Sequence, residues 1–115
     1  MSARVAKKLT TFDAARPTAA IIMANLTDSQ LGTVVAFRRA AEERNLQFFY
    51  VLNKSDLVSA HHIDKTVKAL GGEIIVASMR TGRGLPAIGR RLKVSPQGAR
   101  VVVLGDLQQR QVEPH

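Results

Sequence analysis

Two short polar segments hold the residue types from which a binding site could be built. The first is Asn53-Lys54-Ser55-Asp56, which directly follows the apolar residues 47–52, and the second is residues 78–85, which follow the apolar residues 73–77. The Asp56 carboxylate can accept two hydrogen bonds, and the Asn53 amide can both donate and accept. In a parallel sheet, ligands bind at the carboxyl ends of the strands. If both apolar runs are strands of one such sheet, the two segments form a single site at that edge.

The elements that would position these segments alternate along the chain. Strand-sized, mostly apolar runs occupy residues 19–24, 47–52, 73–77 and 100–104. Helices are predicted over residues 2–15, from Leu31 onward after a capping box of Thr27 and Gln30, over 63–70 and over 85–94. The alternation predicts an α/β fold, a three-layer sandwich with a mostly parallel sheet of about four strands. We expect a single domain over residues 1–105 and a polar, frayed or disordered tail over residues 106–115.

The apolar spacing also predicts which helix faces point inward. The inward residues of the first three helices are expected to be Val5, Lys8, Leu9 and Phe12; Leu31, Val34, Val35, Arg38 and Ala41; and Ile63, Val67 and Leu70. The outer face of the second helix is expected to hold Arg39, Glu42, Glu43 and Arg44. Gly71-Gly72 is expected to stop the third helix.

The chain is strongly basic, with a formal charge of +8 and a pI near 10.9. Such a domain is attracted to polyanions, so nucleic acid is a candidate partner. The aromatic residues amount to only 4%, which leaves little material for stacking on bases. Any RNA contact is therefore expected to be mainly to phosphates.

Several classes of site and location find no support in the residue types. There are no cysteines, which excludes disulfides and thiolate metal sites. His61, His62 and His115 do not form a convincing metal set, so no metal site is predicted. No apolar run approaches the length of a membrane span, so we expect no membrane association and a cytoplasmic location.

The two polar segments resemble the guanine-binding loops of P-loop GTPases. The specificity motif of that family, Asn-Lys-x-Asp after a buried strand, is matched by Asn53, Lys54 and Asp56. Its last nucleotide loop, Ser-Ala-Lys-x-Gly-x-Gly-Leu, is matched by Ser78, Arg80, Gly82, Gly84 and Leu85, with Met79 in place of alanine and Arg80 in place of lysine. The competing interpretation is an ordinary Asn-Lys loop with a helix-capping aspartate, followed by a glycine-rich turn.

The resemblance implies a role for each residue. Asp56 would accept hydrogen bonds from N1–H and the amino group of guanine, and adenine would be rejected because it presents an acceptor there. Asn53 would tie the base to the neighbouring loop, and the aliphatic stem of Lys54 would lie on the purine face. Ser78 and Arg80 belong to the same site, the backbone N–H near Met79 would meet the guanine oxygen, and the loop would turn at its glycines.

The order of the motifs is similar to that of the circularly permuted GTPases of ribosome assembly, in which the guanine loops precede the phosphate loop. Residues 100–105 resemble the strand that introduces that loop. However, Arg110, Gln111 and Val112 stand where its glycine, lysine and hydroxyl residue belong. The resemblance thus implies a GTP- or GDP-binding half-domain, and we do not expect this chain alone to hydrolyse GTP.

Two alternatives to nucleotide binding remain open. One is an RNA- or ribosome-binding module that uses Arg80, Arg83, Arg90, Arg91 and Lys93, although Arg90, Arg91 and Lys93 more commonly form a solvated helix face. The other is an interaction scaffold on a degenerate fold. Because a half-sheet exposes strand edges, we expect a homodimer or a partner that covers an edge. A smaller closed unit or a truncated gene would also account for the missing loop.

Overall fold

The computed structural model describes residues 3–28 and 31–105 of the chain. Four helices, one short 3-10 helix and four strands follow one another in these residues. They are α1 (Ala3–Ala14), β1 (Ala19–Asn25), α2 (Leu31–Glu43), β2 (Gln47–Asn53), η1 (Ser55–Leu57), α3 (Ala60–Leu70), β3 (Ile74–Val76), α4 (Leu85–Lys93) and β4 (Val101–Gly105). The strands form one sheet in the order β3-β2-β1-β4, and every pairing is parallel.

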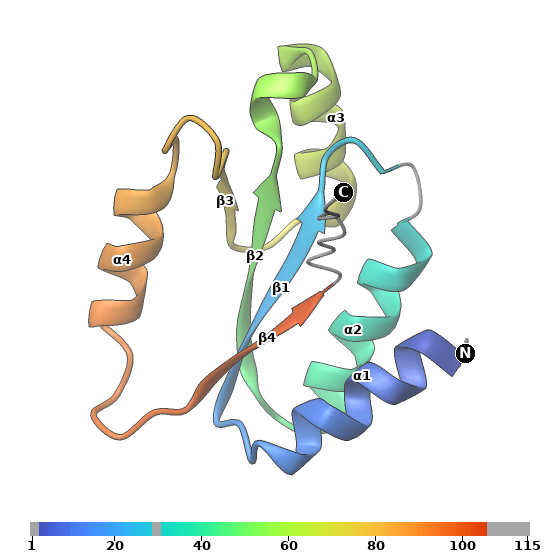
Figure 1. Cartoon of the computed structure of the whole chain (residues 1–115), viewed down its shortest axis with the longest axis vertical. Helices are drawn as coiled ribbons and strands as arrows, with labels where there is room; N and C mark the ends of the chain where they lie inside the picture. The colour runs from blue at the N-terminus through green and yellow to red at the C-terminus, as the bar shows by residue number, and fades with distance from the viewer. Residues whose placement is uncertain (1–2, 29–30, 106–115) are drawn as a thin grey trace, which may run out of the picture.

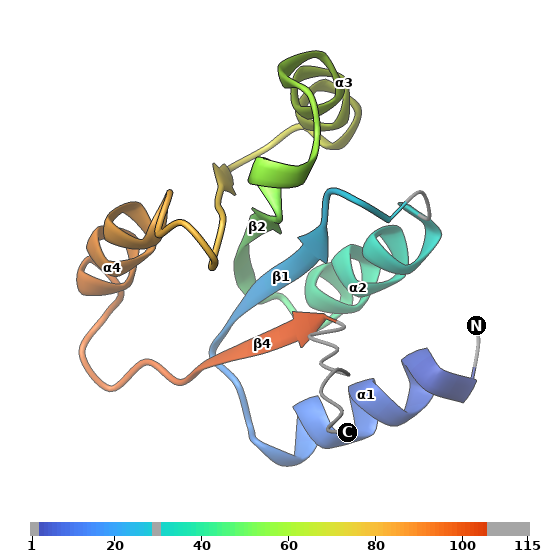
Figure 2. The same cartoon turned by 45° about the horizontal axis from the view of Figure 1, so that its top comes forward.

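Helices cover both faces of this sheet, and the two faces have separate cores. Figures 1 and 2 show α1 and α2 on one side of the sheet and α4 on the other. Because successive strand residues point to opposite faces, Ile22 and Tyr50 pack with α1 and α2, whereas Ile21 and Val51 pack on the α4 side. Half-buried Ile88 of α4 joins that second core. The predicted α/β class and the parallel sheet of about four strands are therefore confirmed.

The inward faces of the helices agree only in part with the predicted ones. Val5, Leu9 and Phe12 of α1 are buried as expected, while Lys8 is half-buried. In α2 the buried residues are Val34, Phe37, Ala40 and Ala41, so the predicted face wrongly omitted Phe37 and Ala40. The stripe passes through Phe37 because residues three and four apart share a helix face, and this spacing leads from Val34 to Phe37, Ala40 and Ala41.

Arg44 does not belong to the solvated outer face of α2. Its side chain is 30% exposed, and its guanidinium forms two hydrogen bonds with Asp13, at 2.7 Å from Nε and 2.8 Å from Nη2. This bidentate pair joins the turn that follows α2 to α1 and lowers the pKa of the Asp13 carboxyl, chiefly through the hydrogen bonds from Arg44.

Some predicted boundaries shift and others cannot be compared. The third helix begins at Ala60 rather than residue 63, because the Ser59 side chain caps it by accepting a hydrogen bond from the His62 amide at 3.1 Å. Gly71 ends it as expected, with φ 68 and an N–H bonded to the Val67 carbonyl. The capping partner Gln30, the start of the first predicted helix at Ser2 and the tail 106–115 lie outside the described residues.

Candidate functional site

The two polar segments lie side by side at the carboxyl ends of β2 and β3. Leu52 of β2 pairs with Val76 of β3, and the Ala77 amide donates to the Leu52 carbonyl at 2.8 Å. The Ser55 amide in turn donates to the Ala77 carbonyl at 3.0 Å. The backbone ladder thus continues beyond the strands and fixes the first segment against the start of the second.

Asp56 is the centre of a small polar cluster that joins the two loops. Its Oδ1 accepts a hydrogen bond from Ser78 Oγ at 2.8 Å, and its Oδ2 lies 3.1 Å from Nη1 of Arg80. The Asp56 residue is exposed as a whole, but its side chain is only 15% exposed, and Ser78 is fully buried. The hydrogen bond from Ser78, aided by the backbone amide of Asp56 and by Arg80, lowers the pKa of the Asp56 carboxyl despite partial desolvation. The carboxylate is therefore held in the ionised, accepting form.

Asn53 provides a second link between the loops. Its side-chain oxygen Oδ1 accepts a hydrogen bond from the Met79 amide at 2.9 Å. The resemblance to guanine-binding loops implies that the backbone N–H near Met79 meets the guanine oxygen. A ligand oxygen at that position would share this N–H with Asn53. This contact joins Asn53 to the neighbouring loop, and the expected contact of Asn53 to a base stays a prediction.

The second loop is shaped by its own hydrogen bonds and by two glycines. The Ser78 amide donates to the Arg83 carbonyl at 2.9 Å, and the Ser78 Oγ accepts from the Thr81 amide at 3.1 Å. Gly82 and Gly84 have φ of 87 and 81, which disfavours any residue with a side chain. At Gly84 a Cβ atom would lie 2.5 Å from the Val76 carbonyl oxygen, so the loop passes against β3 there.

Lys54 and Ser55 complete the first loop. Lys54 is exposed and adopts a left-handed conformation with φ 67 and ψ 33, which turns the chain from β2 into η1. Ser55 is buried, and its Oγ has no hydrogen-bond partner among the described residues. The sequence predicted no function for Ser55. An unsatisfied buried hydroxyl is uncommon, and this one lies next to Asp56 in the first loop.

One contact that positions α3 was not predicted from the sequence. His62 of α3 lies with Nε2 2.9 Å from the Leu26 carbonyl oxygen, just beyond β1. It fastens α3 to the end of the neighbouring strand. The sequence shows only that His62 is a polar residue near the start of a helix that follows the first loop.

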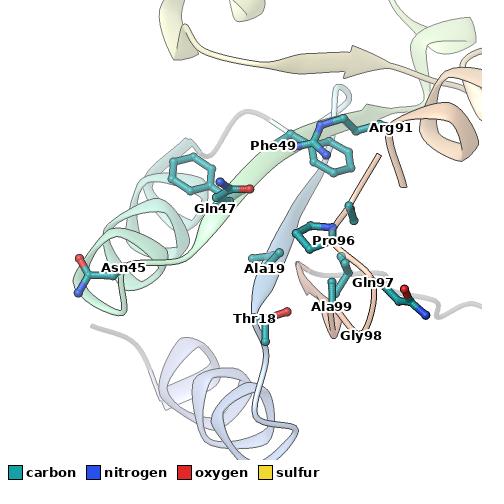
Figure 3. A pocket seen from close by; sticks show the side chains of 14 residues that line it. Thr18, Ala19, Asn45, Gln47, Phe49, Arg91, Pro96, Gln97, Gly98 and Ala99 are labelled. Carbon is teal, nitrogen blue, oxygen red and sulfur yellow. The ribbon is translucent and has the colours of Figure 1, made fainter. Parts of the chain in front are cut away.

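A separate cavity of about 380 Å³ lies at the opposite end of the sheet. Figure 3 shows its lining, including Arg91 beside the Phe49 ring and the linker residues Pro96 to Ala99. Arg91 lies 5.0 Å from the centroid of that ring and 2.6 Å from Glu73, and its side chain is 24% exposed. The expectation that Arg91 belongs to a solvated face is therefore wrong, because it is held by an aromatic ring and a carboxylate.

Comparisons with family models, with curated proteins and with solved structures found no match to the chain. Among residues 3–28 and 31–105, no three histidine, aspartate or glutamate side chains are grouped as metal ligands would be. Within the same ranges, every helix is too short or too polar to cross a bilayer.

Proposed function

We propose that the chain binds a guanine base at the cluster formed by Asn53, Asp56 and Ser78. The observation that carries the proposal is the Asp56 carboxylate, largely shielded from solvent and ionised, which Ser78 fixes between two interlocked loops. A fixed pair of acceptor oxygens suits the adjacent N1–H and amino donors of guanine. Adenine offers an acceptor at the first of these positions and would leave the carboxylate unpaired.

Arg80 sets the main condition for binding. Its guanidinium lies on Oδ2 of Asp56, where one guanine donor would bind, and its side chain is 77% exposed. Because the arginine side of this ion pair is exposed, solvent can replace its contact to Asp56, and a base can displace Arg80 into solvent. Ser78 keeps its bond to Oδ1 and holds the carboxylate in place. Lys54, exposed on the same loop, supplies an aliphatic stem for the purine face.

The proposal does not include GTP hydrolysis by this chain alone. Phosphoryl transfer depends on positioned phosphates and a metal ion, and Arg110, Gln111 and Val112 replace the residues that would hold them. Without phosphate contacts the affinity is expected to be low. Kinship with the circularly permuted GTPases of ribosome assembly and a cytoplasmic location are parts of this proposal.

The RNA-binding alternative is less well supported. Two of the five cations on which it relies are engaged within the chain, Arg80 with Asp56 and Arg91 with Glu73. Cations held by carboxylates contribute less to phosphate binding, because the carboxylate competes with phosphate.

Titration with fluorescent GDP tests the proposal. We expect saturable binding that GTP competes and ATP does not, and that Asp56→Ala abolishes. Asp56→Asn replaces one acceptor by a donor at unchanged size, so this variant is expected to lose guanine and to gain xanthine, which carries an oxygen in place of the amino group. Absence of binding at millimolar nucleotide, or equal competition by ATP, would overturn the proposal.

Arg80→Ala provides a sharper test of the same site. Because the variant frees Oδ2 of Asp56, GDP is expected to bind more tightly than to the unmodified chain. Arg83→Ala is the matched control, since it removes an exposed arginine from the same loop and leaves Asp56 unchanged. Equal effects of both variants would show that Arg80 acts only through the net charge.

A further inference from the structure

The two edges of the sheet differ in how well they are protected. At one edge, β3 is only three residues long. At the other, β4 is five residues long, reads VVVLG and, among residues 3–28 and 31–105, pairs with β1 alone. Natural proteins protect edge strands by shortness, charge, proline or a covering segment. Within the described residues, β4 has none of these, and Val103 is 39% exposed.

A groove runs between β4 and helix α1. It has a volume of about 450 Å³. One wall is the strand itself, residues 102–105, and the other is the face of α1 that carries Arg4, Lys7, Lys8 and Thr11. Buried Phe12 lies at its base and packs in the same core as Leu104. The groove therefore combines backbone hydrogen-bonding groups with an apolar base.

The charge of the groove is one-sided. Arg4, Lys7 and Lys8 are its charged residues, and no aspartate or glutamate occurs among the described residues that line it. Arg4 and Lys7 are exposed, and Lys8 is half-buried. The acidic residue of α1, Asp13, does not line the groove and is bound to Arg44. The described lining of the groove therefore favours a ligand with negative charge.

We propose that this groove binds an extended acidic peptide segment of another protein, which adds to β4 as a fifth strand. The outer edge of β4 would supply main-chain hydrogen bonds, and Lys7 and Lys8 would meet acidic side chains on the side facing α1. A second copy of the chain fits poorly, because edge-to-edge pairing would bring two of these cationic clusters together. Single-stranded RNA also fits poorly, since Phe12, the aromatic residue of the groove, is 2% exposed and cannot stack on a base.

Nuclear magnetic resonance titration of the full, isotope-labelled chain tests the proposal. The probe is a capped peptide of alternating glutamate and valine, long enough to span β4. We expect saturable shifts concentrated in the amides of β4 and α1. The corresponding lysine–valine peptide is expected not to bind. The acidic peptide with methyl groups on alternate backbone nitrogens is expected to bind more weakly, because it cannot donate the strand hydrogen bonds.

Charge-reversal variants separate the groove from general attraction to a basic chain. The double variant Lys7→Glu, Lys8→Glu is expected to weaken peptide binding by about tenfold. The control is Arg90→Glu, Lys93→Glu on α4, which changes the net charge equally at exposed positions and is expected to change binding by less than about twofold. Circular dichroism checks that both variants fold.

Four outcomes would overturn the proposal. These are equal weakening by the two double variants, unchanged binding of the methylated peptide, shifts spread away from β4, and saturation of the same amides by poly(U) but not by the peptide. Self-association of the chain through β4, detected by sedimentation, would assign the groove to a second copy instead.

Discussion

The first two helices and the last two are attached to the sheet in different ways. Helices α1 and α2 bury seven residues between them, including Phe12 and Phe37. Helices α3 and α4 bury none, and Leu85 and Leu92 of α4 are exposed. The segments around α3 and α4 contribute only half-buried apolar residues such as Leu70 and Ile88, and polar contacts join them as well, among them Ser78 with Asp56, Asn53 with Met79 and Arg91 with Glu73. The fully buried helix residues thus lie in one part of the molecule, and the candidate site belongs to the other.

This contrast has a physical meaning. Apolar burial contributes free energy in proportion to area and has no preferred direction, so it suits a supporting core. Hydrogen bonds between side chains contribute less free energy but fix groups in defined orientations. Binding sites are commonly placed in such less stable regions on a rigid support.

The largest effect is expected for Phe37→Ala in α2. Phe37 is 1% exposed in the first core, and truncating a buried phenylalanine costs about 3–5 kcal/mol. Urea denaturation measures the loss. A matched pair, Val34→Ala in α2 and Val67→Ala in α3, removes the same atoms from a buried and a half-buried position. Equal costs for the pair would contradict the division into two regions.

Gly84→Ala is expected to have the next largest effect, about 1–3 kcal/mol, although it lies in the region with few buried residues. The added Cβ would meet the Val76 carbonyl at 2.5 Å, at a φ of 81. Gly82→Ala is the control, because it has a similar φ but no atom within 4 Å of the added Cβ. If both variants unfold at the same urea concentration, the close approach to β3 carries no cost beyond the backbone conformation.

Ser59→Ala is expected to destabilise α3 by about 1 kcal/mol, because it removes the cap on the His62 amide. Since α3 has no buried residue, the loss should appear as faster hydrogen exchange within α3 more than as a change in global unfolding. Ser59→Asp keeps an accepting oxygen and should restore slow exchange. Uniformly faster exchange across the sheet would show that α3 unfolds with the core.

The smallest effect is expected for Asp13→Asn, less than about 1 kcal/mol, since the ion pair with Arg44 is partly exposed. The pKa of Asp13 is lowered from 3.8 in the folded chain, so the pair stabilises the fold above that value. The stabilisation is lost as the pH falls through the folded pKa. The difference from the unmodified chain, measured by urea denaturation at a series of pH values, should therefore vanish in acid. A difference that stays constant across this range would contradict the role of the ion pair.

The strands could be predicted because each is an apolar run of its own, bounded by polar or glycine residues. The inward faces of the helices were harder to predict than the strands. In α2, charged Arg38 fits the spacing of the predicted inward face, and Ala40 is too small to mark a core position clearly. The predicted face therefore omits Phe37, although Phe37 is nearly inaccessible to solvent. Ser59 directly precedes α3 and is a residue type that commonly caps helices. Because the predicted boundary did not use this cap, it placed the start of α3 too late.

For the candidate site, the sequence predicted which segments meet but not how their side chains pair. Neighbouring parallel strands bring residues 53–56 and 78–80 to one edge, which follows from topology alone. The bonds from Asp56 to Ser78 and Arg80 span 22 and 24 residues, and such pairs depend on loop conformations that no local spacing specifies. The same holds for Arg91, whose position over Phe49 depends on where α4 packs.

Because the Met79 amide donates a hydrogen bond to Asn53, its hydrogen exchange reports on the contact between the two loops. Met79 is 44% exposed and lies outside any helix or strand, where an amide hydrogen normally exchanges with water quickly. Here the amide hydrogen can exchange only after its hydrogen bond to the Asn53 side chain breaks. The exchange rate at this one amide therefore measures how often the two loops separate. A base bound between the loops would slow it without any change in the rest of the sheet.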